Sequence, residues 1–223
     1  MGGFTEDRGG NPGRRIKTLG TFRIAVVGLL VVAAMGCSAE TKYEPTSGDI
    51  IFQTSRSSQS VAIQMATNSK YSHMGIVYLR GGVPFVFEAV EPVKITPLDE
   101  WIARGENGHF VVKRLSNAST ILTPDALRRM QVVAEEYMGR HYDLYFEWSE
   151  ERIYCSELVW LVYQRALDIS IGDLETLGDF DLSSPVVKKL LAERWGESPP
   201  MDELVISPAA VFASDKLVEV YRN

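Results

Sequence analysis

The sequence predicts an α+β fold in one domain, with an antiparallel sheet packed against helices. Runs of strand-like composition gather in the first half of the chain, and runs with helical spacing gather in the second half. Two strand-like runs are separated only by Gly81-Gly82, which is typical of a tight antiparallel hairpin. Of the 223 residues, 45% are hydrophobic and 23% are charged, as in an ordinary globular protein.

The expected elements follow one another along the chain. Strands are expected where apolar residues alternate or run together, at residues 49–53, 73–80, 83–90, 109–115 and 216–221. Helices are expected where apolar residues recur every three or four positions, at residues 60–67, 96–103, 123–139, 183–195 and 207–214, and from Cys155 onward. The helix at 96–103 would be capped by Thr96 and the helix at 123–139 by Thr123. Residues 140–153 are expected to form a loop rich in aromatic residues.

The N-terminal segment has the composition of an export signal. Basic residues precede an apolar run at residues 24–36, whose 13 residues are too few to span a bilayer comfortably. The run leads into Gly36-Cys37, which resembles a bacterial lipoprotein signal and implies lipid on Cys37. We therefore expect a signal peptide at 1–36, a polar tether at 37–47 and a folded domain at 48–223. An uncleaved anchor or an ordinary secretory signal is the alternative.

Removal of residues 1–36 would make the chain more acidic. That segment holds five of the 23 basic residues and two of the 29 acidic ones, so residues 37–223 carry 18 basic and 27 acidic residues, a net charge of −9. This charge argues against nucleic acid as a partner. It also argues against binding to anionic lipid by charge alone. We expect an exported lipoprotein, anchored to the membrane by its N-terminal lipid and facing the periplasm or the cell exterior.

Cys155 would lie at the start of a helix, in the stretch YCSELVWLVY. The chain has two cysteines, so lipid on Cys37 would leave Cys155 without a partner for a disulfide. Free backbone N–H groups and the helix dipole stabilise a thiolate at such a position, and the same N–H groups can hold an oxyanion. The alternative is a buried and inert cysteine, because free cysteines are among the most buried residues.

The hairpin around Gly81-Gly82 brings a histidine and a carboxylate together. A two-residue turn pairs Arg80 with Val83, so His73 and Glu88 lie on one face of the sheet as diagonal neighbours, with backbones roughly 7–8 Å apart. A carboxylate among apolar strand residues is costly to bury without a partner, and an imidazole is a suitable one. Such a carboxylate orients the ring and stabilises its cation. The alternative is that Glu88 faces solvent.

Three segments together resemble a known family. GDIIFQTSRSSQSVAIQMATNSKYSHMGIV, the later FEAV and YCSELV are similar to the permuted papain-like branch of the NlpC-type cysteine hydrolases, the YiiX/YebB-like group. The likeness extends over most of residues 48–220, with the histidine preceding the cysteine. It implies a permuted papain-like fold with an antiparallel sheet or small barrel. It also implies Cys155 as nucleophile, His73 as base and Glu88 as the orienting residue.

Further residues are candidates for binding substrate or an oxyanion. Gln53 could offer a side-chain N–H to an oxyanion, and Glu157 suits the first helical turn after the cysteine. Tyr142 and Asp143 resemble the family's YD segment beside the cleft, and Tyr154 precedes the cysteine. His141, in the aromatic loop, is a rival base. Each of these residues has a purely structural alternative, and the spacing of the three histidines and two cysteines predicts no metal site and no cofactor.

The sequence therefore predicts a thiol-dependent hydrolase that cleaves an amide or ester bond through a Cys-His-Glu triad. Its substrate would be a small molecule, a peptide or an acyl amide, of cell-wall peptide or fatty-acyl-amide type. The alternative is a lipid- or peptide-binding lipoprotein on the same fold with little or no turnover. The combination of Cys155, His73 and Glu88 favours the hydrolase, because a binding module does not need all three.

Overall fold

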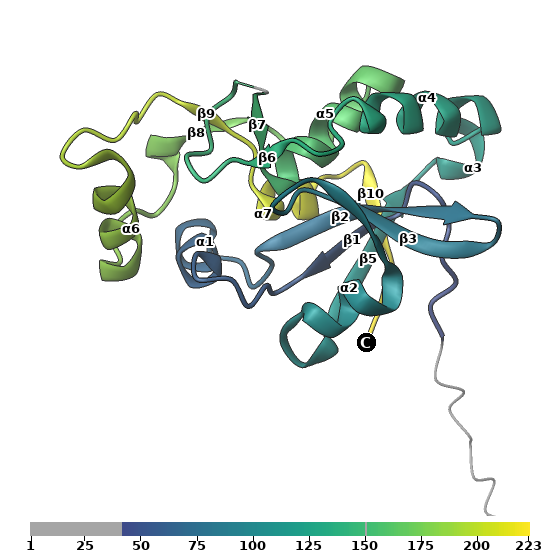
Figure 1. The fold of residues 1–223 in the computed structure, drawn as a ribbon, viewed down its shortest axis with the longest axis horizontal. Coiled ribbons are helices and arrows are strands. Elements are labelled where there is room, and N and C mark those ends of the chain that lie inside the picture. The colour runs from purple at the N-terminus through teal and green to yellow at the C-terminus, as the bar shows by residue number, and fades with distance from the viewer. Residues whose placement is uncertain (1–41, 150) are drawn as a thin grey trace, which may run out of the picture. The chain divides into compact units, whose positions relative to one another are not determined.

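A six-stranded antiparallel sheet forms the centre of the protein (Figure 1). The structure is a computed structural model that describes residues 42–149 and 151–223. The strand order is β10-β5-β1-β2-β3-β4, and every neighbouring pair is antiparallel. The strands are β1 (Ile50–Gln53), β2 (His73–Arg80), β3 (Val83–Glu88), β4 (Lys94–Pro97), β5 (Phe110–Leu115) and β10 (Leu217–Arg222). The predicted α+β class with an antiparallel sheet is confirmed.

The β2–β3 hairpin has the predicted register. Arg80 pairs with Val83, and Ile76 pairs with Phe87. Gly81 and Gly82 have φ angles of 57° and 83°, so both occupy the left-handed region that a two-residue turn of this kind requires. A third glycine, Gly75, lets the strands approach near the histidine, because a Cβ there would lie 2.5 Å from Val86 Cγ1.

Helices cover both faces of the sheet (Figure 1). Alternate strand residues such as Phe52 and Met74 pack with helices α4 (Pro124–Glu135), α5 (Cys155–Leu167) and α7 (Pro208–Ala213). The residues between them, such as Ile51 and Val77, pack with helix α2 (Leu98–Arg104) on the opposite face. This two-residue alternation is the usual pattern of a strand buried on both faces.

The remaining elements lie around this core. They are helices α1 (Ser60–Thr67), α3 (Ala118–Ile121) and α6 (Pro185–Trp195), the 3-10 helices η1 (Glu106–Gly108) and η2 (Leu177–Asp179), and four two-residue strands: β6 (His141–Tyr142), β7 (Arg152–Ile153), β8 (Glu175–Thr176) and β9 (Leu204–Val205). Helices α1 and α6 contact each other at one end of the sheet (Figure 1). The segment predicted as an aromatic loop contains the short parallel pair β6–β7.

Two helix starts test the capping predictions. Thr123 caps α4 as predicted, because its Oγ1 accepts the N–H of Ala126 at 3.2 Å. The predicted cap at Thr96 is wrong. Thr96 lies in β4, opposite Val86 of β3, and α2 begins only at Leu98. Pairing between strands outweighed a local capping signal here.

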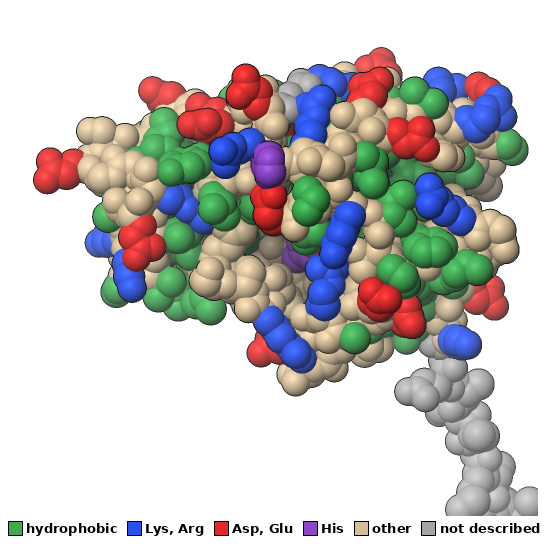
Figure 2. All heavy atoms as spheres, viewed as in Figure 1, with side chains coloured by type: hydrophobic (Ala, Val, Ile, Leu, Met, Phe, Trp, Pro, Cys, Tyr) green, Lys and Arg blue, Asp and Glu red, His purple; other side chains and the backbone are tan. Residues whose placement is uncertain are grey.

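The folded domain begins earlier than the predicted boundary at residue 48. Tyr43 is buried against the rings of Phe110 and Tyr221, and its hydroxyl donates to Asp49 Oδ2 at 2.7 Å. Residues from Tyr43 onward therefore belong to the domain and not to a tether. The predicted signal peptide and Cys37 lie outside the described residues. Within the described part of the chain, no helix is long and apolar enough to cross a membrane. Acidic and basic side chains are mixed over the face drawn in Figure 2.

Candidate active site

Cys155 is the first residue of helix α5, as predicted. Tyr154 before it is extended, with φ −105° and ψ 168°, and its backbone N–H donates to Glu157 Oε2 at 3.4 Å. This arrangement caps the helix and fixes the position of the thiol. The side chain of Cys155 is buried, and the backbone N–H groups of Met74 and Ser156 are directed at its sulfur.

His73 connects the thiol to a carboxylate. It is the first residue of β2 and is buried, and its ring stacks on Trp101 of α2 with ring centroids 5.8 Å apart. His73 Nε2 lies 2.6 Å from Glu88 Oε2, and the ring and the Cys155 thiol are close enough to shift each other's pKa. Because Glu88 occupies Nε2, the other ring nitrogen, Nδ1, is left for the thiol. The predicted contact between His73 and Glu88 is therefore present.

Glu88 has two further partners that the sequence did not reveal. Its side chain is fully buried, and its second oxygen, Oε1, accepts hydrogen bonds from Thr96 Oγ1 at 2.6 Å and from the guanidinium group of Arg104. Thr96 follows the same diagonal rule as the His73–Glu88 pair, across the β3–β4 ladder. It could have been found if the strand β4 had been predicted. No pattern in the sequence indicates Arg104.

These contacts shift the pKa values of all three groups. Burial opposes the charged form of each group, but the mutual hydrogen bonds and charges outweigh it. The pKa of Glu88 is lowered to about 2, and the pKa of His73 is raised to about 9 by hydrogen bonds with Cys155 and Glu88. The same contact with His73 lowers the pKa of the Cys155 thiol. The site therefore favours a thiolate beside an imidazolium, which is the reactive form of a catalytic cysteine.

The other candidates divide into two groups. Tyr142 and Tyr154 line a pocket together with Cys155. Gln53, Asp143 and Glu157 are buried outside its lining. The amide oxygen of Gln53 packs against Gly105 on the α2 side of the sheet. The carboxylate of Asp143 accepts the backbone N–H groups of Tyr145 and Glu147, so it shapes the loop after β6.

His141, the rival base, is not at the thiol. Its side chain is 72% exposed, and its Nδ1 lies 2.6 Å from Glu91 Oε1. The second oxygen of Glu91 accepts the backbone N–H of Tyr142 at 2.9 Å. The structure therefore brings His73, and not His141, to Cys155.

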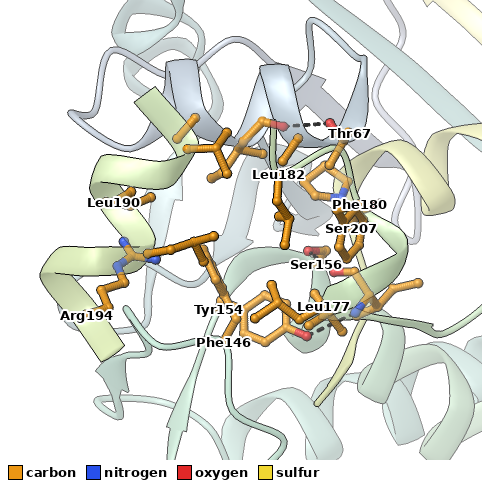
Figure 3. Close-up of a pocket in the computed structure, with 18 of the residues that line it drawn as sticks. Thr67, Phe146, Tyr154, Ser156, Leu177, Phe180, Leu182, Leu190, Arg194 and Ser207 are labelled. Carbon is orange, nitrogen blue, oxygen red and sulfur yellow. Dashed lines mark hydrogen bonds between the residues drawn. The ribbon is translucent and has the colours of Figure 1, made fainter. Parts of the chain in front are cut away.

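An apolar pocket opens beside Cys155 (Figure 3). Its empty volume is about 670 Å³, which includes the solvent space at its open mouth. Leu177, Phe180 and Leu182 form one part of its wall, and Leu190 and Arg194 of helix α6 form another. The hydroxyl of Tyr154 accepts the backbone N–H of Ile206 at 3.1 Å, which holds the segment before α7 against the pocket. Arg194 is the one charged residue of the lining.

Two relatives match most of the chain. A protein of Escherichia coli strain K12 that bears the name "Uncharacterized protein YiiX" is 47% identical over 195 residues, which cover 87% of this chain and 95% of that protein. The crystal structure of a protein described as metalloprotein yiiX from Escherichia coli O157:H7 superposes with a TM-score of 0.78 and 49% identity. That match covers 81% of this chain and 99% of the other. Among the described residues of the present chain, no group of three or more histidine, cysteine or acidic side chains is arranged to hold a metal ion.

A family description matches the same region. The sequence model of the permuted papain-like amidase enzymes, the YaeF/YiiX or C92 family, matches residues 44–221. This range includes the whole sheet up to Tyr221 as well as His73, Glu88 and Cys155. The permuted order, with His73 and Glu88 before Cys155, agrees with that description. The chain therefore belongs to the permuted papain-like amidase family, YaeF/YiiX.

Proposed function

We propose that this protein is a thiol-dependent hydrolase that cleaves an amide or ester bond through Cys155, His73 and Glu88. One observation carries the proposal: a fully buried carboxylate is hydrogen-bonded to the imidazole of His73, and that imidazole in turn interacts with the Cys155 thiol at the start of a helix. A triad needs this arrangement of a nucleophile, a base and an orienting group. The family description as amidases supports the same reaction class.

The reaction follows from the positions of these groups. The Cys155 thiolate attacks the carbonyl carbon, and the negative charge moves to the carbonyl oxygen, where N–H groups of the helix start can stabilise it. The imidazolium of His73 gives its proton to the leaving nitrogen or oxygen, and a thioester on Cys155 remains. Water then attacks the thioester while His73 accepts its proton, which releases the acid and restores the thiol.

The pocket favours a fatty-acyl substrate over a cell-wall peptide. Its lining is apolar apart from a few polar groups, and it begins at the nucleophile. A peptide carries an amide group at every residue, and burying these groups without partners is costly, whereas an alkyl chain gains about 0.8 kcal/mol for each buried CH₂. We therefore place the acyl side of the scissile bond in the pocket.

The location of the protein is a second part of the proposal. The signal-like residues 1–36 and Cys37 support export and lipid anchoring. A membrane anchor would keep the pocket close to lipid-derived substrates. Replacing Cys37 by Ser tests this part, because loss of lipid predicts that the exported protein no longer partitions into detergent.

The experiment for the reaction uses a series of N-acyl aminocoumarin amides with chains of 2 to about 16 carbons. We expect kcat/KM to rise about fourfold per added CH₂ until the pocket is filled. Intact-protein and peptide mass spectrometry should detect the acyl group on Cys155 during turnover. The Cys155→Ala variant should show neither product nor adduct. Hydrolysis that persists in Cys155→Ala would contradict the proposal. A wild-type protein that binds the acyl chains but never becomes acylated would support the lipid-binding alternative.

A further inference from the structure

A row of three polar side chains runs from helix α6 to the thiol. Arg194 of α6 donates from Nη2 to Gln59 Oε1 at 2.7 Å. Gln59, just before helix α1, donates from Nε2 to the hydroxyl oxygen of Tyr142 at 3.0 Å. Tyr142 and Cys155 both line the pocket, and the phenol lies close enough to the thiol for their charges to interact. The three segments are far apart in the sequence and meet at this site.

The directions of these hydrogen bonds are fixed by the chemistry of arginine. A guanidinium group can only donate, so the amide oxygen of Gln59 must face Arg194, and the amide nitrogen must then face Tyr142. The hydroxyl oxygen of Tyr142 accepts from that nitrogen. Its own proton is therefore turned away from Gln59 and is free to point toward the sulfur of Cys155.

Tyr142 also keeps this proton. Burial, together with the nearby charge of Cys155, raises the pKa of its phenol. A neutral O–H beside the sulfur is a donor in the resting enzyme, where it faces the thiolate. During the reaction the negative charge moves from sulfur to the former carbonyl oxygen, and a donor beside both atoms stabilises the charge in its new place.

We infer that Gln59 is a positioning residue that fixes the Tyr142 hydroxyl as a hydrogen-bond donor to the oxyanion, and that Arg194 sets the orientation of Gln59. The inference rests on the proposed function, because it assigns roles within the same reaction. It gives helix α6 two tasks, since Arg194 also stacks on Phe146 in the pocket wall, 5.0 Å from the ring centroid to the guanidinium carbon.

The decisive variants reverse or remove the hydrogen bond from Gln59. In Gln59→Glu a carboxylate can only accept, so it accepts a hydrogen bond from the O–H of Tyr142 and turns the hydroxyl away from the oxyanion. Removing one oxyanion donor costs about 10²-fold in kcat, and we expect a loss of this size for both Tyr142→Phe and Gln59→Glu. Gln59→Met, which has similar volume and no donor, should lose about tenfold. The double variant Gln59→Glu/Tyr142→Phe should lose no more than Tyr142→Phe alone.

Other readouts separate this role from a structural one. In the Gln59 variants KM should change less than about twofold, and the loss in kcat should be equal for short and long acyl chains, because Gln59 does not line the pocket. The exposed neighbour Ser58 gives a matched control, since Ser58→Glu adds the same charge without reaching Tyr142. On α6, Arg194→Gln should lose about tenfold in kcat, whereas Lys189→Gln, whose side chain is 77% exposed, should retain wild-type kcat.

A measurement without turnover keeps the inference independent of the substrate. The pH dependence of iodoacetamide alkylation at Cys155 reports the pKa of the thiol. Tyr142→Phe and Gln59→Met should both raise this pKa, and the double variant should raise it no further. Losses in kcat that multiply, or thiol shifts that add, would overturn the inference even if hydrolysis proceeds as proposed. If Cys155 is never acylated in the wild type, the proposed function fails, and the alkylation data alone then decide whether Gln59 acts through Tyr142.

Discussion

His73 and His141 make nearly the same contact and occupy opposite environments. Each has a ring nitrogen 2.6 Å from a glutamate oxygen, Glu88 for His73 and Glu91 for His141. The side chains of the first pair are 9% and 0% exposed, and those of the second pair are 72% and 59% exposed. A short distance between imidazole and carboxylate therefore does not identify a catalytic pair.

Burial and additional partners make the difference. Solvent and salt screen an exposed pair, and such pairs contribute between 0 and about 1 kcal/mol. Glu88 cannot exchange His73 for water, and Thr96 and Arg104 hold its other oxygen. Cys155 then gives His73 a second charged partner, and the pKa of the ring rises to about 9. The ordered network, more than the pair within it, prepares the thiolate.

The test of this comparison with the largest expected effect replaces each of the two histidines by alanine. His73→Ala removes the group that protonates the leaving atom and stabilises the thiolate, so kcat should fall by about 10⁴-fold or more on the acyl amides. His141→Ala should change kcat less than about twofold, because its ring is exposed and does not line the pocket. Steady-state rates with equal amounts of folded protein measure both. Full activity in His73→Ala together with an inactive His141→Ala would place the base in the aromatic loop.

The second test replaces each of the two glutamates by glutamine. Glu88→Gln should lower kcat by about 10²-fold to 10³-fold, because the amide can still accept from the ring but no longer stabilises its cation. The pKa of His73 should fall toward its ordinary value, so the alkaline limb of kcat/KM, expected near pH 9 in the wild type, should move to lower pH. The pKa of Cys155 should rise. Glu91→Gln should leave both limbs in place, and an unshifted alkaline limb in Glu88→Gln would separate the carboxylate from the acid.

The sequence carried the local part of the site. The two-glycine turn determines the register of the hairpin, and the register determines which side chains share a face, so the contact between His73 and Glu88 could be predicted. Cys155 could be placed at a helix start because the apolar spacing begins there. In both cases a few adjacent residues contain the whole signal.

The rest of the site depends on contacts that no local pattern encodes. Gln59 and Arg194 are 135 positions apart and meet only through the packing of α1 on α6. Gln53 was predicted as an oxyanion candidate from its side-chain N–H at a strand end, and it pairs with His73 across β1 and β2. Its amide oxygen, however, packs against Gly105, and Gln53 does not line the pocket beside Cys155. The position of the cysteine relative to the strand ends is decided by helix packing, and the strand pattern alone cannot show it.

The test with the smallest expected effect concerns the arginine near each carboxylate, Arg104 for Glu88 and Arg152 for Glu91. Arg104 is 42% exposed, so its pairing with Glu88 should contribute no more than about 1 kcal/mol to the free energy of unfolding at pH 7. Arg104→Gln should remove that contribution and lower kcat by about threefold, because Thr96 and His73 still hold the carboxylate. Arg152→Gln, beside the exposed Glu91, should change neither quantity measurably.

The difference in unfolding free energy between wild type and Arg104→Gln should depend on pH, because it depends on the charge of Glu88. The pKa of Glu88 is about 2 in the folded protein and near 4.5 when unfolded, so its carboxylate stabilises the fold above about pH 4.5, and this stabilisation is lost as the pH falls toward 2. A protonated Glu88 gains little from Arg104. Wild type and Arg104→Gln should therefore differ in urea unfolding at pH 7 and at pH 4.5, and converge only as the pH falls toward 2, where Glu88 of the folded protein becomes protonated. A difference that stays constant down to pH 2 would mean that Arg104 stabilises the fold through its packing and not through the charge of Glu88.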